Sequence, residues 1–197
     1  MSGGRRDGVC FGTACDPWRP AGLQRSGLWL VDPASGEARL VREGVGGVIS
    51  WSPDGSRLTF SDDDGVYVLE PRNGTVKRIA SGQAAGLVWA PDGRRLALSV
   101  PTDRAQRTYS LRIVGADGTG ARDPTVGTPK EHLESLPRWS PDGRRLAFVR
   151  TRVYYRRPPP GARTPVSHVF VVAAAGGTPR RLTRLRLPEV AVDWSRR

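Results

Sequence analysis

The stretch Trp51-Ser52-Pro53-Asp54-Gly55 decides the fold, because the same pentapeptide returns further along the chain. It recurs as Trp89-Ala90-Pro91-Asp92-Gly93 and Trp139-Ser140-Pro141-Asp142-Gly143, and Asp193-Trp194-Ser195 is a truncated fourth copy. Successive tryptophans are 38, 50 and 55 residues apart, close to the roughly 40–45 residues of a four-stranded propeller blade. The repeat therefore predicts an all-β protein, a β-propeller of about four four-stranded blades.

Each residue type in the pentapeptide has a structural reason to be there. Proline fixes φ at the second position of a turn, aspartate accepts local backbone hydrogen bonds, and glycine adopts positive φ. A tight hairpin between the first and second strands of each blade is the expectation. The tryptophan ends the first strand once per blade, so we interpret Trp51, Trp89, Trp139 and Trp194 as packing between blades rather than as a ligand cage.

The flanks of the pentapeptide repeat as well. An arginine and an alternating strand follow each copy, at residues 57–60, 95–98 and 145–148, and the alternation predicts one buried face. Third strands are expected at 65–69, 109–114 and 168–172, and polar fourth strands at 77–79 and 180–183. Complete blades are predicted at about 45–81, 83–129 and 131–184.

The pattern W-S-P-D-G-x-R-[LI]-[AT]-F, then V-F-V-V and G-G-T-P-R-R-L-T, resembles the WD-like repeats of TolB-type β-propellers over about residues 27–195. The resemblance implies one of two roles for the chain. Many members of that family are binding platforms of the periplasm or envelope, and in others the propeller is the non-catalytic domain of a prolyl-oligopeptidase-type peptidase. The family supplies no catalytic residue for these motifs.

The two ends of the sequence predict one shared blade. Residues 27–32 and 37–41 read as third and fourth strands, 190–195 as a first strand, and the N-terminal segment 1–26 supplies one outer strand near 9–11. Residues 4–42 with 189–195 would then close a four-bladed ring. The alternative is a fragment of a ring of about six to eight blades, whose open edges would favour a homodimer.

The charge of the chain indicates a solvated basic surface. Net charge is +12, and it comes from arginines spread over every blade, which argues against a nucleic-acid partner. Cys10 and Cys15 are too few for a zinc site, and their redox state stays open. No apolar run approaches the ~20 residues of a membrane span. The chain as written is expected in the cytoplasm, and in the periplasm or envelope if the true start lies upstream.

The most distinctive segment is a long basic and aromatic loop after residue 150. Loops on rigid scaffolds often carry binding residues, and we predict that this one binds a protein or peptide. The alternatives are a solvated insertion without a binding role and stacking of its Arg and Tyr residues on single-stranded nucleic acid. The candidate binding residues are Arg152, Tyr154, Tyr155, Arg156, Arg157 and Arg163. A shorter loop at 101–108 is expected on the same side of the ring.

No pattern in the chain predicts catalysis. His132 and His168 are the only histidines, too few for a confident base or metal cluster. The Asp62-Asp63-Asp64-Gly65 stretch fails the calcium-loop pattern and is read as a hairpin turn. We therefore predict no metal, no cofactor and no enzymatic activity. The expected function is a binding scaffold, and the alternative is the propeller portion of a hydrolase whose catalytic domain is absent from this chain.

Overall fold

Strands and tight turns make up the computed structural model, which describes residues 27–45, 47–103, 108–125, 132–152, 166–184 and 192–195. The chain divides into two units, Met1–Gly46 and Gly47–Arg197. In the first unit, β1 (Gly27–Val31) and β2 (Ala38–Glu43) form an antiparallel hairpin. This confirms the predicted neighbouring strands at 27–32 and 37–41. The predicted strand near 9–11 and Cys10 and Cys15 lie outside the described residues.

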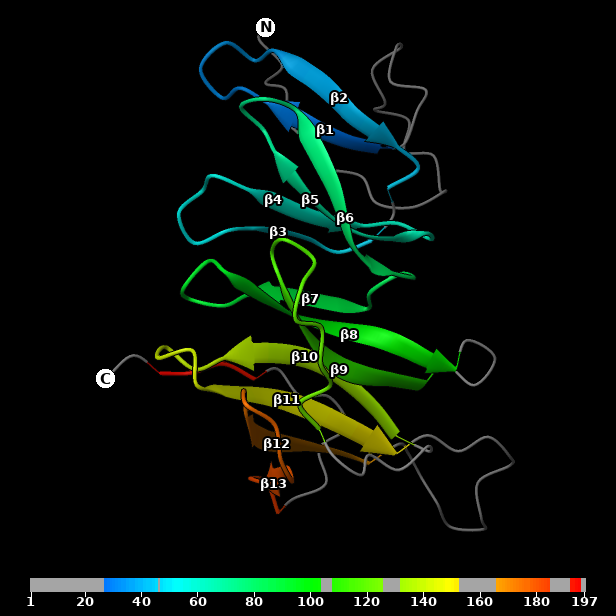
Figure 1. Cartoon of the computed structure of the whole chain (residues 1–197), viewed down its shortest axis with the longest axis vertical. Helices are drawn as coiled ribbons and strands as arrows, with labels where there is room; N and C mark the ends of the chain where they lie inside the picture. Colours follow the sequence, from blue (N-terminus) through cyan, green and yellow to red (C-terminus); the bar gives the residue numbers. More distant parts are fainter. Residues whose placement is uncertain are drawn as a thin grey trace, which may run out of the picture. The chain divides into compact units, whose positions relative to one another are not determined.

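The second unit contains three successive blades, arranged in one four-stranded and one seven-stranded sheet (Figure 1). The first is an antiparallel sheet of four strands in chain order: β3 (Ile49–Trp51), β4 (Leu58–Ser61), β5 (Gly65–Glu70) and β6 (Thr75–Ser81). The second blade has β7 (Gly86–Trp89), β8 (Arg95–Asp103) and β9 (Thr108–Gly115). The third has β10 (His132–Trp139), β11 (Arg145–Arg152), β12 (Ser167–Ala173) and β13 (Arg180–Arg181). A single parallel pairing of Leu133 with Tyr109 joins the second and third blades into the seven-stranded sheet, β7–β13. First, second and third strands thus lie where the repeat predicts them.

Two predicted strands differ from expectation. In the second blade, a single antiparallel bridge between Ile113 and Arg122 stands where a fourth strand was expected. Residues 192–195, expected within a first strand, are assigned to no strand. A closed ring is not shown by the described residues.

The pentapeptides form the predicted hairpin turns. In the first copy, the Ser52 nitrogen donates to the Arg57 oxygen at 2.8 Å, and the Gly55 nitrogen donates to the Ser52 oxygen at 2.9 Å. Gly55 has a φ of 69°, a conformation that glycine adopts without steric cost. The hydrogen bond from the Ser52 hydroxyl, with those from Ser56, lowers the pKa of Asp54 to about 2.

The core consists of two apolar layers between the blades, which we call the first and second seams. The first seam lies between β3–β6 and β7–β9 and includes Val68, Ile79 and Leu98. The second lies between β7–β9 and β10–β13 and includes Leu111 and Phe148.

The predicted buried face of the second strand is confirmed for β4, where Leu58 is 1% and Phe60 0% exposed, and the opposite face of this strand is buried as well. Leu58, Thr59, Phe60 and Ser61 are all buried. β4 is an inner strand of its sheet, paired with β3 on one side and β5 on the other. The alternation in the sequence marks which of two packed surfaces a side chain meets.

The packing prediction for the tryptophans holds at both seams. Trp89 is 5% exposed and Trp139 is 7% exposed. Each indole lies under an arginine of the preceding blade, Arg57 at 4.9 Å from the Trp89 ring and Arg95 at 4.9 Å from the Trp139 ring.

Trp51 departs from this packing, since its side chain is 50% exposed. The reason is its place in the second unit: its strand belongs to the first of the three blades there, so no earlier blade of that unit covers the ring. The prediction of inter-blade burial is therefore wrong for this copy in the structure as described.

Candidate binding site at the loop end of the third blade

The register of the third blade brings polar side chains together at one end. Glu134 on β10 lies opposite Arg150 on β11, and Arg150 lies opposite His168 on β12. His132 lies opposite Arg152 in the adjoining register position. Directly opposed residues share a face of the sheet, as do residues two apart on a strand. All five side chains therefore belong to one face, and they include both histidines of the chain.

Glu134 is the buried centre of this group. Its side chain is 0% exposed. One carboxylate oxygen accepts hydrogen bonds from Arg150 Nη2 at 2.5 Å and Nε at 3.1 Å. The other accepts from the Leu111 backbone nitrogen at 3.1 Å and the Thr125 hydroxyl at 2.9 Å. A buried carboxylate needs such compensation because its desolvation is costly, and here it ties the third blade to the second.

Arg150 is held on two sides. Its guanidinium pairs with Glu134, and it also lies over the rings of Phe170, at 4.8 Å, and Phe148, at 5.6 Å. The side chain is only 11% exposed. Arg150 is thus a rigid cation at the boundary between the apolar part of the seam and its polar end.

Two loops start from this end of the blades. Leu133 bridges in parallel to Tyr109, which places the start of β10 beside the start of β9. The tips of β8 and β11 point the same way (Figure 1). The described ends of both loops therefore lie on the same side, as the sequence predicted.

Each loop has a hydroxyl pair at its base. The Thr102 and Thr108 hydroxyls are 3.0 Å apart, and the Thr151 and Ser167 hydroxyls are 2.8 Å apart. A hydrogen bond across the last residues of each hairpin fixes where the blade ends and the loop begins.

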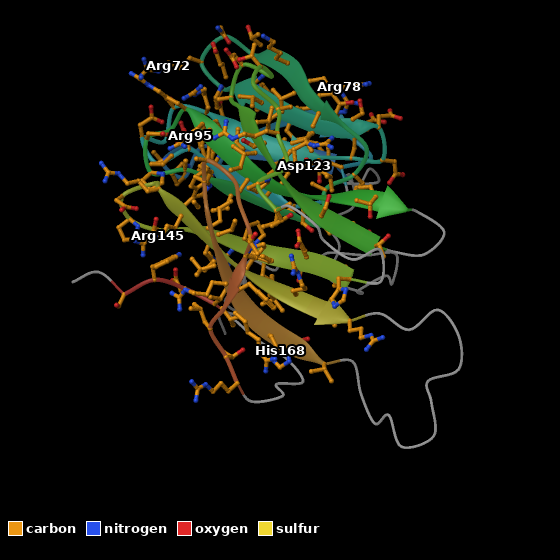
Figure 2. All side chains as sticks on the ribbon, turned by 60° about the horizontal axis from the view of Figure 1, so that its bottom comes forward. Arg72, Arg78, Arg95, Asp123, Arg145 and His168 are labelled. Carbon is orange, nitrogen blue, oxygen red and sulfur yellow. The ribbon has the colours of Figure 1, made fainter. Side chains whose placement is uncertain are left out.

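Among the six predicted binding residues, the structure describes Arg152. It ends β11, is exposed, and its backbone nitrogen donates to the Val166 oxygen at 3.2 Å. The remaining predicted residues lie outside the described part of the chain: Tyr154, Tyr155, Arg156, Arg157 and Arg163. Figure 2 labels His168 on β12, near the end of the blade from which the Arg152 loop starts, and Arg145 near its other end.

Sequence reasoning missed Glu134 and Arg150. A signal was present in the repeat: five residues before Trp139 stands Glu134, whereas Ala84, 2% exposed, stands five residues before Trp89. A charged residue at a repeat position that is apolar and buried elsewhere needs a partner, and such a mismatch singles out this blade.

The acidic stretch at 62–64 behaves as the predicted turn. Asp62 is 7% exposed, and its Oδ1 accepts from the backbone nitrogens of Asp64 at 2.9 Å and Gly65 at 3.0 Å. Within the described ranges no three His, Cys, Asp or Glu side chains are grouped so as to hold a metal ion. No helix of the described residues is long and apolar enough to cross a membrane.

Comparison with solved structures identifies the fold. No family model matches the chain, and no curated protein matches it in sequence. A putative TolB from Agrobacterium tumefaciens superposes with a TM-score of 0.60 and 21% identity over 82% of this chain and 57% of that one. TolB from Acinetobacter baumannii gives 0.55 and 20% over 84% of this chain and 39% of the other.

A peptidase is similar to the same degree. Dipeptidyl peptidase 4 from Porphyromonas gingivalis gives a TM-score of 0.55 and 18% identity over 86% of this chain and 31% of the peptidase. The fold is thus the β-propeller. More particularly, it is the kind of propeller found in TolB and in peptidases, as the repeat motifs predicted. The chain spans less than two thirds of each of these proteins.

Proposed function

We propose that this chain is a non-enzymatic binding propeller and that it takes an acidic segment of a protein or peptide at the loop end of the third blade. The observation that supports this is the gathering of His132, Arg150, Arg152 and His168 on one face around a single buried carboxylate. The net charge of +12 favours an acidic partner through longer-range attraction.

The cluster of polar side chains at the loop end has a buried part, Glu134 and Arg150, and an exposed residue, Arg152. Glu134 neutralises Arg150 and holds it against the seam, so Arg150 sets the shape of the surface. Arg152 is exposed at the tip of the strand, with His132 opposite. A guanidinium recognises carboxylates through paired hydrogen bonds, so Arg152 is the residue we assign to the ligand.

The sequence carries further residues of binding type after Arg152. These residues, which follow Arg152 within eleven positions, are Tyr154, Tyr155, Arg156, Arg157 and Arg163. Arginine and tyrosine are the residue types that most often dominate binding interfaces. We assign them to the same binding function on this sequence basis.

Fluorescence anisotropy of the full chain with a labelled Glu/Asp-rich peptide and its Gln/Asn counterpart tests the proposal. At physiological salt the chain is expected to bind the acidic peptide and not its Gln/Asn counterpart. The Arg152→Glu variant should bind the acidic peptide about tenfold or more weakly. The control is Arg72→Glu, the same charge change in the β5–β6 turn, which lies at the Pro-Asp-Gly end of its blade. Equal effects of both variants would mean that only net charge matters, and would contradict the assignment.

The same assay separates a nucleic-acid partner. A labelled single-stranded oligonucleotide that binds more tightly than the peptide, with a steep dependence on salt, would replace the proposed partner class. Retention that disappears at physiological salt would reflect the basic surface alone.

A second candidate function is the non-catalytic propeller portion of a hydrolase. It is favoured by the similarity to part of a dipeptidyl peptidase. Its test is co-purification of the full chain with the products of adjacent reading frames, where a stable complex with a hydrolase would support it. A stable complex with a non-enzymatic acidic protein would support the first proposal instead.

A further inference from the structure

A single hydrogen bond is repeated along the second unit. The indole Nε1 of Trp89 donates to the Ser50 oxygen at 3.1 Å, and that of Trp139 donates to the Val88 oxygen at 3.3 Å. In each case the acceptor is the residue just before the tryptophan of the preceding copy. We call this the indole contact.

The truncated fourth copy makes the same contact. Trp194 Nε1 donates to the Arg138 oxygen at 3.1 Å, and Arg138 stands just before Trp139. Residues 192–195 belong to no strand. The indole contact therefore needs neither a complete pentapeptide nor a formed sheet on the donor side.

In this series of indole contacts, one indole donor, that of Trp51, and one backbone acceptor, that of Asp193, have no partner among the described residues. Trp51 is the first indole, and no residue of the described ranges accepts from its Nε1 or places an arginine over its ring. Asp193 stands just before Trp194, and its backbone oxygen accepts no hydrogen bond within the described part of the chain. Both residues are exposed, so the two groups that the indole contact would join next both face solvent.

The surroundings of Trp51 add apolar area to this surface. Ile49 lies two residues earlier on β3, on the same face of the strand, and its side chain is 41% exposed. A tryptophan with its indole nitrogen unsatisfied, beside an exposed isoleucine, is the composition of an interface rather than of a solvated surface.

We propose that Trp51 of one copy docks on residues 192–195 of a second copy, with its Nε1 donating to the backbone oxygen of Asp193. The occupant is a second copy because the described structure does not join these two groups within one chain. When both copies make the contact, it occurs twice and closes a dimer. This inference is independent of the peptide-binding proposal, since it uses a different surface.

The test is the mass of the full chain in solution, by size-exclusion chromatography with light scattering over a range of concentrations. The parent chain is expected to dimerise as concentration rises, and Trp51→Ala to weaken dimerisation at least about tenfold. Trp194→Ala, which releases the acceptor segment, should have the same effect. Val76→Ala, at another exposed apolar residue on β6 (40%), is the control and should leave dimerisation unchanged.

Other outcomes overturn the proposal. A parent chain that stays monomeric at every concentration would contradict the proposed dimer. Quenching of tryptophan fluorescence by iodide would then show whether Trp51 is shielded by its own chain, as in a closed ring. Dimerisation that survives Trp51→Ala, or that is lost with Trp51→Ala but kept with Trp194→Ala, also contradicts the assigned pair. Circular dichroism of each variant confirms that the β-structure is retained.

Discussion

The two seams between the blades are built from the same repeat, yet they differ in chemistry. Both share the buried tryptophan, the stacked arginine and the indole contact. At equivalent positions, Ser61 donates to the Ala84 oxygen in the first seam and Ser99 donates to the Glu134 oxygen in the second. Among the residues that the structure describes, only the second seam adds a buried ion pair. The comparison teaches that the repeat sets the packing between blades, while one substituted position gives a single blade its polar end.

The largest expected effect comes from breaking the ion pair that distinguishes the second seam. Glu134→Ala leaves Arg150 buried without its carboxylate, and it leaves the Leu111 nitrogen and Thr125 hydroxyl without an acceptor. We expect the free energy of unfolding to fall by about 3–5 kcal/mol, measured by urea denaturation.

The double variant Glu134→Ala/Arg150→Leu is the matched control for that measurement. Removing both charges makes the second seam resemble the first, where Ala84 stands at the equivalent position. Much of the lost stability should return, because no uncompensated charge stays buried. Equal losses in the single and double variants would show that the ion pair is not what distinguishes the seams.

A smaller effect is expected from the arginines that the seams share. Arg57 Nη2 donates to the Gly93 oxygen at 2.5 Å, and Arg95 Nη2 donates to the Gly143 oxygen at 3.1 Å. Arg57→Met and Arg95→Met should each lower the free energy of unfolding by about 1–2 kcal/mol. Urea denaturation of both variants measures the costs, and values that differ by more than about 1 kcal/mol would mean that the two seams are not equivalent.

The next effect has the opposite sign. The hydroxyl of Thr59 is buried in the first seam without a hydrogen-bond partner among the described residues, whereas Ala97 stands at the equivalent place in the second blade. Thr59→Val keeps the shape and removes the unsatisfied hydroxyl, so it should raise the free energy of unfolding by about 1 kcal/mol. A thermal melt that shows a lower midpoint would instead reveal a partner for this hydroxyl.

The smallest expected effect is a change in how the stability of the first pentapeptide turn depends on pH. The pKa of Asp54 is lowered to about 2, first by the Ser52 hydroxyl and then by Ser56. A lowered folded-state pKa contributes stability above the unfolded value of about 4, and this contribution is lost as the pH falls toward about 2.

The measurement is unfolding between these pH values for the parent chain and for Ser52→Ala. The variant should show a weaker dependence on pH, since the hydroxyl that most lowers the Asp54 pKa is gone. The second copy of the pentapeptide already has Ala90 at the position of Ser52. There the aspartate, Asp92, is paired with Arg95 at 2.7 Å instead of with a serine hydroxyl. An unchanged pH dependence in Ser52→Ala would assign it to other carboxylates.

Local chemistry explains how much of the fold was predictable. The hairpins follow from proline, aspartate and glycine within five residues, so Trp51-Ser52-Pro53-Asp54-Gly55 and its copies were sufficient to place them. The partner of Glu134 was not predictable in this way. It depends on the register between β10 and β11, which a bulge interrupts between Ser135 and Arg138, where Leu136 adopts a φ of 51°.

The candidate site was predictable only in its location. The loop after residue 150 was identified by its composition, and Arg152 lies where that interpretation puts it. The two histidines are 36 positions apart in the sequence, and only the antiparallel pairing of three strands brings them to one face. Contacts of that range depend on tertiary pairing, which residue spacing alone does not determine.

The hydroxyl pairs at the loop bases carry an evolutionary consequence. The Thr102–Thr108 and Thr151–Ser167 hydrogen bonds close each hairpin before its loop begins. Doubling the length of a closed loop costs only about 0.6 kcal/mol. Insertions beyond these pairs are therefore expected to cost little stability. This end of the propeller can diversify its recognition residues under selection while the blades beneath it stay unchanged.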